Sequence, residues 1–258
     1  MTDLNDEKLA GLAKRADVFL QSGGAPDADT ERVFDEIRQI ASAEAGWIGL
    51  AQIDPTIGDV AGNGLKIARY IRYAERVGLD MIAFPELALM GYPVEDVIDR
   101  HPVVVAENVR WVKKLAKLCK NTTALVGFVE PRGDSPVGRR YYNAVAVLNG
   151  GEVKGIVRKR LLPTYSEFND SRYIEPSPVA GVQPADTLGA FGPDRVVDIK
   201  KTIAVNGVSY GVSICEDCWN NKEFFHRTLY AVDPVEELAA ADSMNERSAQ
   251  AVYDFFRE

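Results

Sequence analysis

The sequence has few of the side chains that form disulfides or metal sites, with three cysteines and two histidines among 258 residues. Cys119, Cys215 and Cys218 form an odd and sparse set, which is typical of a reducing cytosol rather than of a disulfide scaffold. A zinc site at the Cys215–Cys218 pair would need Cys119 and the distant His101 and His226 as further ligands. We therefore expect no metal site. The acidic residues between the paired cysteines also argue against a redox dithiol, because negative charge raises a thiol pKa.

Long basic runs and long apolar runs are missing as well. The formal net charge is -8 without any long basic run, which argues against nucleic acid or an anionic membrane as the main partner. No apolar run approaches the roughly 20 residues that span a membrane, and the first residues are acidic and polar, unlike a secretory signal. We expect a cytoplasmic protein that binds neither nucleic acid nor membrane. Hydrophobic residues make up 46% of the chain, as in an ordinary globular domain.

Residues 1–46 have the periodicity of helices and contain no strand pattern. Apolar residues share one helical face up to Leu20, and turn residues at 22–27 interrupt that pattern. A second amphipathic run begins at Thr30. The sequence therefore predicts an N-terminal helical extension of two helices over residues 1–46.

From Trp47 onward the pattern alternates between strand and helix. The sequence predicts helices at 65–77 and 103–120, and strands at 47–53, 80–84, 123–129, 142–148, 152–158, 201–205 and 209–214. Asn149-Gly150-Gly151 and Asn206-Gly207 are strong hairpin signals, and helical pattern resumes from about Trp219, with a helix start at Asp233-Pro234. These features predict an α/β protein with a mixed sheet and helices outside it. The Pro- and Gly-rich loop at 166–195 is long enough to be a functional cover.

Three chemically complementary residues lie at the ends of predicted strands. Glu86 follows the strand at 80–84, Lys159 comes directly after the strand at 152–158, and Cys215 follows the strand at 209–214. Each of them alone is more simply interpreted as a surface acid, a surface base or an inert buried cysteine. Together they supply the proton acceptor, the cation and the nucleophile that amide hydrolysis through a thioester requires. We also expect the strand-to-helix turn at Cys215 to favour the thiolate through helix-end N–H groups.

The flanking residues resemble the nitrilase, or carbon–nitrogen hydrolase, superfamily, and within it the glutaminase domain of glutamine-dependent NAD synthetases. The segments that carry the resemblance are residues 47–59, 86–96, 159–170 and 214–219. The resemblance implies a nitrilase-like αββα sandwich with mixed sheets, a catalytic triad of Glu86, Lys159 and Cys215, and L-glutamine as substrate. It also implies that Tyr92, Tyr165 and Phe168 line the substrate site, and we favour this over the core packing that three clustered aromatic residues also suit.

The same resemblance implies that the released ammonia amidates an adenylated nicotinic acid dinucleotide. The glutaminase reaction needs no cofactor, whereas ATP and deamido-NAD would be used by a synthetase domain that this sequence lacks. We therefore expect an NAD synthetase domain or subunit as a partner, and a homo-oligomer. The resemblance covers residues 47–242, and residues 243–258 form a helical tail that does not match the family. We expect the sandwich to be incomplete at its C-terminal end, and the helices of residues 1–46 to cover part of the apolar surface thus left open.

Two other functions stay open. A chain that keeps the triad but cannot close its substrate site would be a non-catalytic or partner-dependent relic, and such a truncated sandwich would unfold at a low temperature. A free-standing amidase that acts on another small carboxamide is the second alternative. A panel of amide substrates separates this amidase from a glutaminase.

Overall fold

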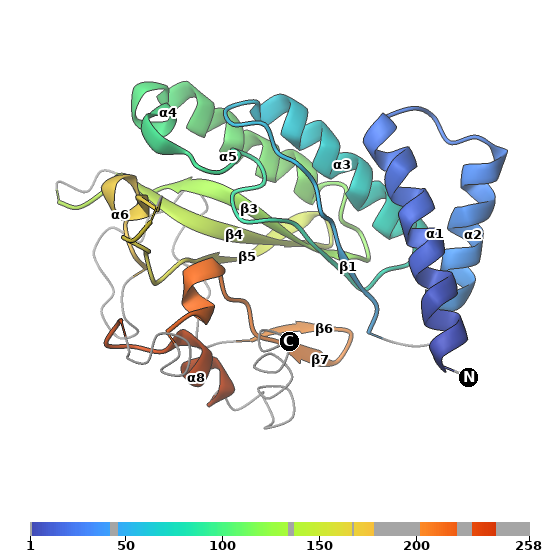
Figure 1. Ribbon diagram of the computed structural model, residues 1–258. Coiled ribbons are helices and arrows are strands. Elements are labelled where there is room, and N and C mark those ends of the chain that lie inside the picture. The colour runs from blue at the N-terminus through green and yellow to red at the C-terminus, as the bar shows by residue number, and fades with distance from the viewer. Residues whose placement is uncertain are drawn as a thin grey trace.

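The computed structural model describes residues 2–41, 46–133, 137–166, 168–177, 202–220 and 229–240 (Figure 1). Its elements run in the order α1 (Thr2–Ser22), α2 (Ala28–Ala41), β1 (Ile48–Leu50), α3 (Val60–Val77), β2 (Met81–Ala83), α4 (Glu95–Arg100), α5 (Pro102–Ala116), β3 (Thr123–Pro131), β4 (Tyr141–Asn149), β5 (Glu152–Arg158), α6 (Asp170–Tyr173), β6 (Ile203–Val205), β7 (Val208–Tyr210), the 3₁₀ helix η2 (Cys215–Cys218) and α8 (Pro234–Ala239).

A five-stranded mixed sheet forms the centre of the fold, with the strand order β1-β2-β3-β4-β5. Strands β1, β2 and β3 are parallel, whereas β4 is antiparallel to both β3 and β5. The turn between β4 and β5 contains Gly150 and Gly151 with φ of 59° and 80°, values that glycine adopts without steric cost. The predicted α/β fold with a mixed sheet and this predicted hairpin are both confirmed.

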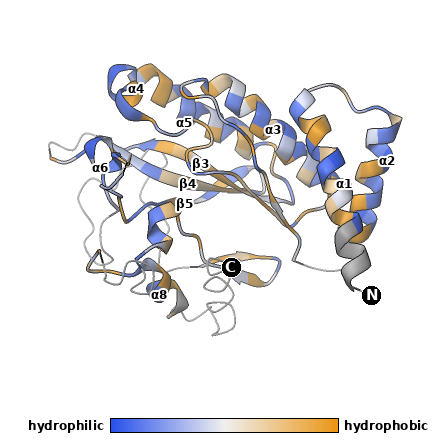
Figure 2. Cartoon of the chain, viewed as in Figure 1, coloured by the Kyte–Doolittle hydropathy of each residue, from blue (hydrophilic) through white to orange (hydrophobic). Residues whose placement is uncertain are grey.

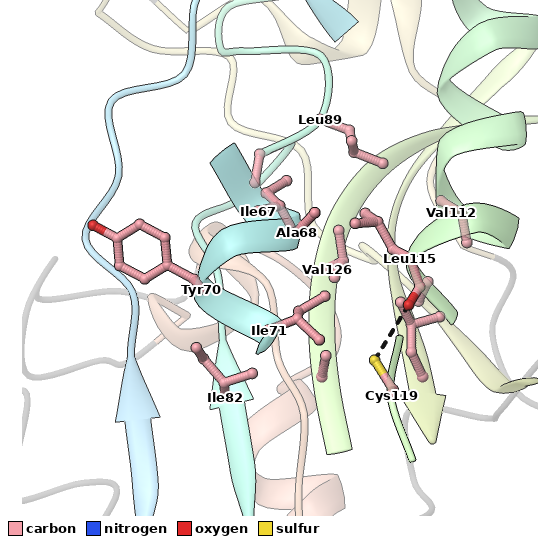
Figure 3. Packing of buried hydrophobic residues seen from close by; sticks show 14 of the residues in the cluster. Ile67, Ala68, Tyr70, Ile71, Ile82, Leu89, Val112, Leu115, Cys119 and Val126 are labelled. Atoms are coloured by element: carbon pink, nitrogen blue, oxygen red, sulfur yellow. Dashed lines mark hydrogen bonds between the residues drawn. The ribbon is translucent and has the colours of Figure 1, made fainter. Parts of the chain in front are cut away.

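Helices α3 and α5 cover one face of the sheet (Figure 1). Their buried faces carry Ile67, Ile71, Val112 and Leu115, which pack with Val126 of β3 in the largest apolar core (Figure 3). Figure 2 shows hydrophilic and hydrophobic residues on both helices, as expected of helices with one buried and one exposed face. Burial of this apolar surface is the main term that holds the helix layer on the sheet.

The other face of the sheet packs against the C-terminal part of the described chain. Val145 of β4 and Val157 of β5 form a buried cluster with Val212 and Ile214, which lead into η2. The antiparallel pair β6–β7, η2 and α8 lie on this side (Figure 1). The predicted β6–β7 hairpin is confirmed, though with three residues in each strand. The end of β5 and the start of η2 are thereby brought close together.

The two N-terminal helices are confirmed and extend the helix layer beside the edge strand β1 (Figure 1). Leu12, Phe34 and Ile37 form a separate buried cluster with Val77 at the end of α3. This cluster lies on the helix side, whereas the opposite face of the sheet is covered by β6–β7, η2 and α8. None of the described helices combines the length and apolar character that a membrane span needs.

Several element boundaries differ from the predicted ones. Helix α3 begins at Val60 rather than 65 because the Asp59 side chain accepts a hydrogen bond from Gly62 N–H and caps the helix there. Strand β1 has three residues instead of seven, α5 ends at Ala116 instead of 120, and the sequence pattern did not predict α4. Much of the predicted cover loop (178–195), residues 221–228 of the predicted helical segment and the whole tail at 243–258 lie outside the described residues.

Candidate active site

Glu86 lies in a turn that follows β2 and stays close to β3. The Leu89 N–H donates a hydrogen bond to Gly127 O at 3.1 Å, which keeps the turn against the neighbouring strand. A Cβ atom at Gly127 would lie 2.5 Å from Pro85 O, so only glycine permits this close approach. The carboxylate of Glu86 is thereby held at the carboxyl end of the parallel strands, where open α/β sheets commonly carry their functional groups.

Lys159 follows the last residue of β5, and its side chain is 1% exposed. Its ammonium group lies 2.7 Å from Glu86 Oε1 and 2.7 Å from Asp170 Oδ2. Burial alone would lower the pKa of Lys159, but the negative charges of these two carboxylates raise it above its ordinary value. Lys159 is therefore a buried cation that remains charged at neutral pH.

Cys215 is the first residue of η2 and has a left-handed φ of 48°. The residue as a whole is exposed, yet the surroundings of its thiol raise the pKa to about 12. Partial burial is the largest cause and the negative charge of Glu86 the second, whereas the charge of Lys159 acts in the opposite direction. The expectation that this turn favours the thiolate was wrong, because partial burial of the thiol and the negative charge of Glu86 together raise its pKa. The thiol therefore needs a base before it can attack.

Asp217 joins the lysine end of β5 to the cysteine turn. Its side chain is fully buried, and its Oδ1 accepts hydrogen bonds from Arg160 N–H at 3.0 Å and Leu161 N–H at 2.8 Å. Its Oδ2 accepts from Ile214 N–H at 3.2 Å, immediately before Cys215. This one carboxylate thus fixes the spacing between the two chain segments that carry the cation and the nucleophile.

The burial of Asp217 predicts a pH dependence of stability. Burial raises its pKa from 3.8 to about 6, although its three backbone hydrogen bonds act to lower it. The folded protein then holds this proton more tightly than the unfolded chain, so the free energy of unfolding falls as the pH rises from about 4 to about 6, by about 3 kcal/mol. Urea unfolding across this pH range, followed by circular dichroism, measures the slope.

In the Asp217→Asn variant we expect this slope to be lost, because the amide does not titrate. Asp35→Asn is the matched control, since Asp35 is 62% exposed and lies 3.9 Å from Arg76. Its curve should keep the slope of the unaltered chain. An Asp217→Asn curve with an unchanged slope would assign the pH dependence to another group.

The three aromatic residues predicted for the substrate site lie together beside the lysine. The ring centroids of Tyr165 and Phe168 are 5.7 Å apart, and those of Tyr92 and Phe168 are 6.5 Å apart. The Tyr92 hydroxyl donates to Asp170 Oδ1 at 3.0 Å, and Asp170 in turn contacts Lys159. The structure thus brings these residues together, and their contact with substrate stays a prediction.

Three polar residues of this region were not predicted from the sequence. Asn143 Nδ2 donates to Glu86 Oε1 at 2.6 Å, and Asp170 holds the lysine. Glu216 is buried and accepts hydrogen bonds from the hydroxyls of Tyr165 at 2.7 Å and Tyr230 at 2.8 Å. Asn143 was detectable as an amide inside an apolar strand, since a buried polar group needs a partner. The other two had no local signal.

The arrangement offers a base, a buried cation and a thiol around one point, which is the set of groups that attack on a carbonyl carbon requires. Among the described residues, no group of three histidine, cysteine or acidic side chains is placed to hold a metal ion.

Comparison with known proteins gives a consistent assignment. The carbon-nitrogen hydrolase family model matches residues 47–226. A glutamine-dependent NAD(+) synthetase of Thermotoga maritima is 36% identical over 178 residues, which are 68% of this chain and 26% of that protein. The chain thus spans about a quarter of the length of this relative.

Two solved structures are similar in fold. A glutamine-dependent NAD+ synthetase from Acinetobacter baumannii has a TM-score of 0.56 and 28% identity, covering 74% of this chain and 30% of that one. An amidase from Nesterenkonia sp. has a TM-score of 0.51 at 18% identity, covering 77% of this chain and 61% of that one, which is a likeness of fold. The predicted nitrilase-like fold is confirmed. The family model matches more than half of the residues of this chain, and the chain therefore belongs to the carbon–nitrogen hydrolase family.

Proposed function

We propose that this chain hydrolyses the side-chain amide of L-glutamine through a thioester on Cys215 and releases ammonia. The observation that carries the proposal is the contact of Lys159 with Glu86 at 2.7 Å, in a site where both charges act on the Cys215 thiol. Membership of the carbon–nitrogen hydrolase family and the similarity to proteins named glutamine-dependent NAD(+) synthetases support the choice of substrate.

The chemistry follows from the charges of the three groups. Glu86 accepts the thiol proton as Cys215 Sγ bonds to the amide carbon, and the carbonyl oxygen becomes negative beside the Lys159 ammonium. The tetrahedral species collapses when the C–N bond breaks and Glu86 passes its proton to the leaving nitrogen, which departs as ammonia. Glu86 then takes a proton from water, whose oxygen attacks the thioester carbon. The C–S bond breaks, glutamate leaves, and Glu86 returns the proton to Cys215 Sγ. The thiol pKa of about 12 is the reason why the base is needed.

The names of the similar proteins support a proposal for what happens to the released ammonia. We propose that the ammonia passes to a synthetase domain or subunit that uses ATP and deamido-NAD, that the hydrolysis itself needs no cofactor, and that the chain self-associates in the cytoplasm. Tyr92, Tyr165 and Phe168 form the wall of the glutamine site in this proposal. Their support is their mutual ring contacts and the hydrogen bond from Tyr92 to Asp170 beside the lysine.

Glutamate release from L-glutamine by the purified chain, beside a Cys215→Ala control, tests the function. We expect release by the unaltered chain and at least a thousandfold loss in the variant, because the variant lacks the nucleophile. No release from the well-folded unaltered chain would contradict a self-sufficient glutaminase. Ammonia release from a panel of small carboxamides then separates the alternative amidase from a relic that needs a partner or has lost catalysis.

A further inference from the structure

We propose that Asn143 is a positioning residue that selects which oxygen of the Glu86 carboxylate accepts the Cys215 proton. The inference rests on the proposed function and adds a fourth residue to it. Asn143 lies in β4, a strand whose residues 141–148 are all buried, and it is 1% exposed. It is an amide in a strand that otherwise consists mainly of apolar residues.

The geometry at Glu86 distinguishes its two carboxylate oxygens. Asn143 Nδ2 lies 2.6 Å from Oε1, and Lys159 Nζ lies 2.7 Å from the same oxygen. Each carboxylate oxygen has about two lone-pair sites, so these two donors occupy Oε1. Oε2 is thereby left as the oxygen that receives the proton from Cys215. An ionised carboxylate only accepts hydrogen bonds, which is why the nitrogen of the amide must face it.

The main chain of Asn143 also contributes, because its carbonyl oxygen accepts the Lys159 N–H at 2.8 Å. One residue therefore sets the position of the base through its side chain and of the cation through its backbone. The amide oxygen Oδ1 is buried and has no hydrogen-bond partner within the described chain. A change of the side chain leaves the backbone contact with Lys159 in place and so tests the contact with Glu86 selectively.

The charges that act at this point come from four elements or turns. The cation of Lys159, the carboxylate of Asp170, the thiol of Cys215 and the hydroxyl of Tyr92 all interact electrostatically with Glu86 or with its lysine partner. In Asn143→Asp a second carboxylate replaces the donor at Oε1. Two adjacent carboxylates resist ionising together, so the acidic limb of the pH–rate profile should move to higher pH by about one unit or more.

The experiment uses two variants and two readouts on the full chain. Asn143→Asp changes the charge at Oε1, and Asn143→Leu removes the donor while keeping a similar volume. The readouts are kcat/KM for glutamate release and the rate of Cys215 alkylation by iodoacetamide, each measured across pH. The alkylation rate is corrected with the Cys215→Ala variant.

We expect Asn143→Asp to move the acidic limb of kcat/KM to higher pH. The alkylation limb should move in the same direction, because the added negative charge also raises the pKa of the Cys215 thiol. We expect Asn143→Leu to lower kcat by about 10- to 100-fold with little change in KM, since a misplaced base slows the chemical step rather than binding. Asn108→Asp is the matched control. Asn108 is also fully buried, its Nδ2 donates to Val129 O at 2.7 Å, and its Oδ1 is equally unpaired within the described chain. It should leave both pH profiles in place.

The outcomes separate this inference from the proposed function, because alkylation needs no glutamine. A shifted alkylation limb in Asn143→Asp, with no glutamate release by the unaltered chain, would support the role of Asn143 and overturn the glutaminase. The inference would be overturned if the unaltered chain releases glutamate and a folded Asn143→Asp variant shows the same acidic limbs as the unaltered chain in the pH profiles of kcat/KM and of alkylation. If Asn143→Asp does not fold, Asn143→Leu decides, and a kcat within twofold of the unaltered chain would overturn the role.

Discussion

Lys159→Met is expected to abolish amide hydrolysis and to destabilise the protein at the same time. The lysine side chain is 1% exposed and lies 2.7 Å from each of two carboxylates, those of Glu86 and Asp170. Without the cation, the two negative charges remain close together in a largely buried site, and the free energy of unfolding should fall by about 3–5 kcal/mol. The tetrahedral oxyanion also loses its stabilising charge, so the rate should fall by a factor of roughly a thousand or more.

Urea unfolding and glutamate release measure the two effects. Lys154→Met is the matched control, because Lys154 is 46% exposed and pairs with Glu152 at 3.2 Å on the surface. This control should change the free energy of unfolding by no more than about 1 kcal/mol. The double variant Lys159→Met with Asp170→Asn should recover part of the stability but none of the activity. A double variant as unstable as the single one would attribute the loss to packing rather than to charge.

Glu86→Gln is expected to change two rates of the same cysteine in opposite directions. Amide hydrolysis should fall by about 100- to 10,000-fold, because the variant has no base to accept the thiol proton. Alkylation of Cys215 by iodoacetamide at about pH 8 should become faster. The negative charge of Glu86 and its hydrogen bond both contribute to the thiol pKa of about 12, and the glutamine side chain removes this charge.

Parallel assays of glutamate release and alkylation on the same preparation test this divergence. Glu152→Gln, at a side chain that is 57% exposed, should leave both rates unchanged. A fall of both rates in Glu86→Gln would indicate that the turn after β2 has moved, and it would contradict the assignment of Glu86 as the base. A rise in alkylation without loss of hydrolysis would assign the base to another residue.

Local sequence determined the hairpins and the helices with strong caps or turns. Gly150 and Gly151 adopt the positive φ values that a tight turn needs, and Asn206 with Gly207 does the same between β6 and β7. Asp233 caps α8 by accepting hydrogen bonds from the next turn. Such signals depend on backbone geometry within a few residues, so the turns and helix starts that they mark can be predicted without knowledge of the fold. The short helix α4 lacks a side-chain cap and could not be predicted from such a local signal.

The sequence also determined which groups lie just after β2 and β5 and at the start of η2. A strand that ends at a known residue brings the residues that follow it to the edge of the sheet. Glu86, Lys159 and Cys215 were found in this way, and their common place in the structure follows from the sheet order and the packing of η2. Their catalytic roles stay a prediction that the variants above test.

Only the tertiary structure decided how these groups are charged and held. Asn143 reaches Glu86 from 57 residues away in sequence, and Asp217 reaches the Leu161 N–H from 56 residues away. The pKa of Cys215 depends on burial and on a carboxylate from another strand end, so the effect expected from the turn alone had the wrong direction. Electrostatic effects of this kind act through space over a few ångströms and depend on the dielectric of the folded interior. A linear sequence therefore specifies the reacting groups, whereas the packing of the sheet against η2 sets their protonation.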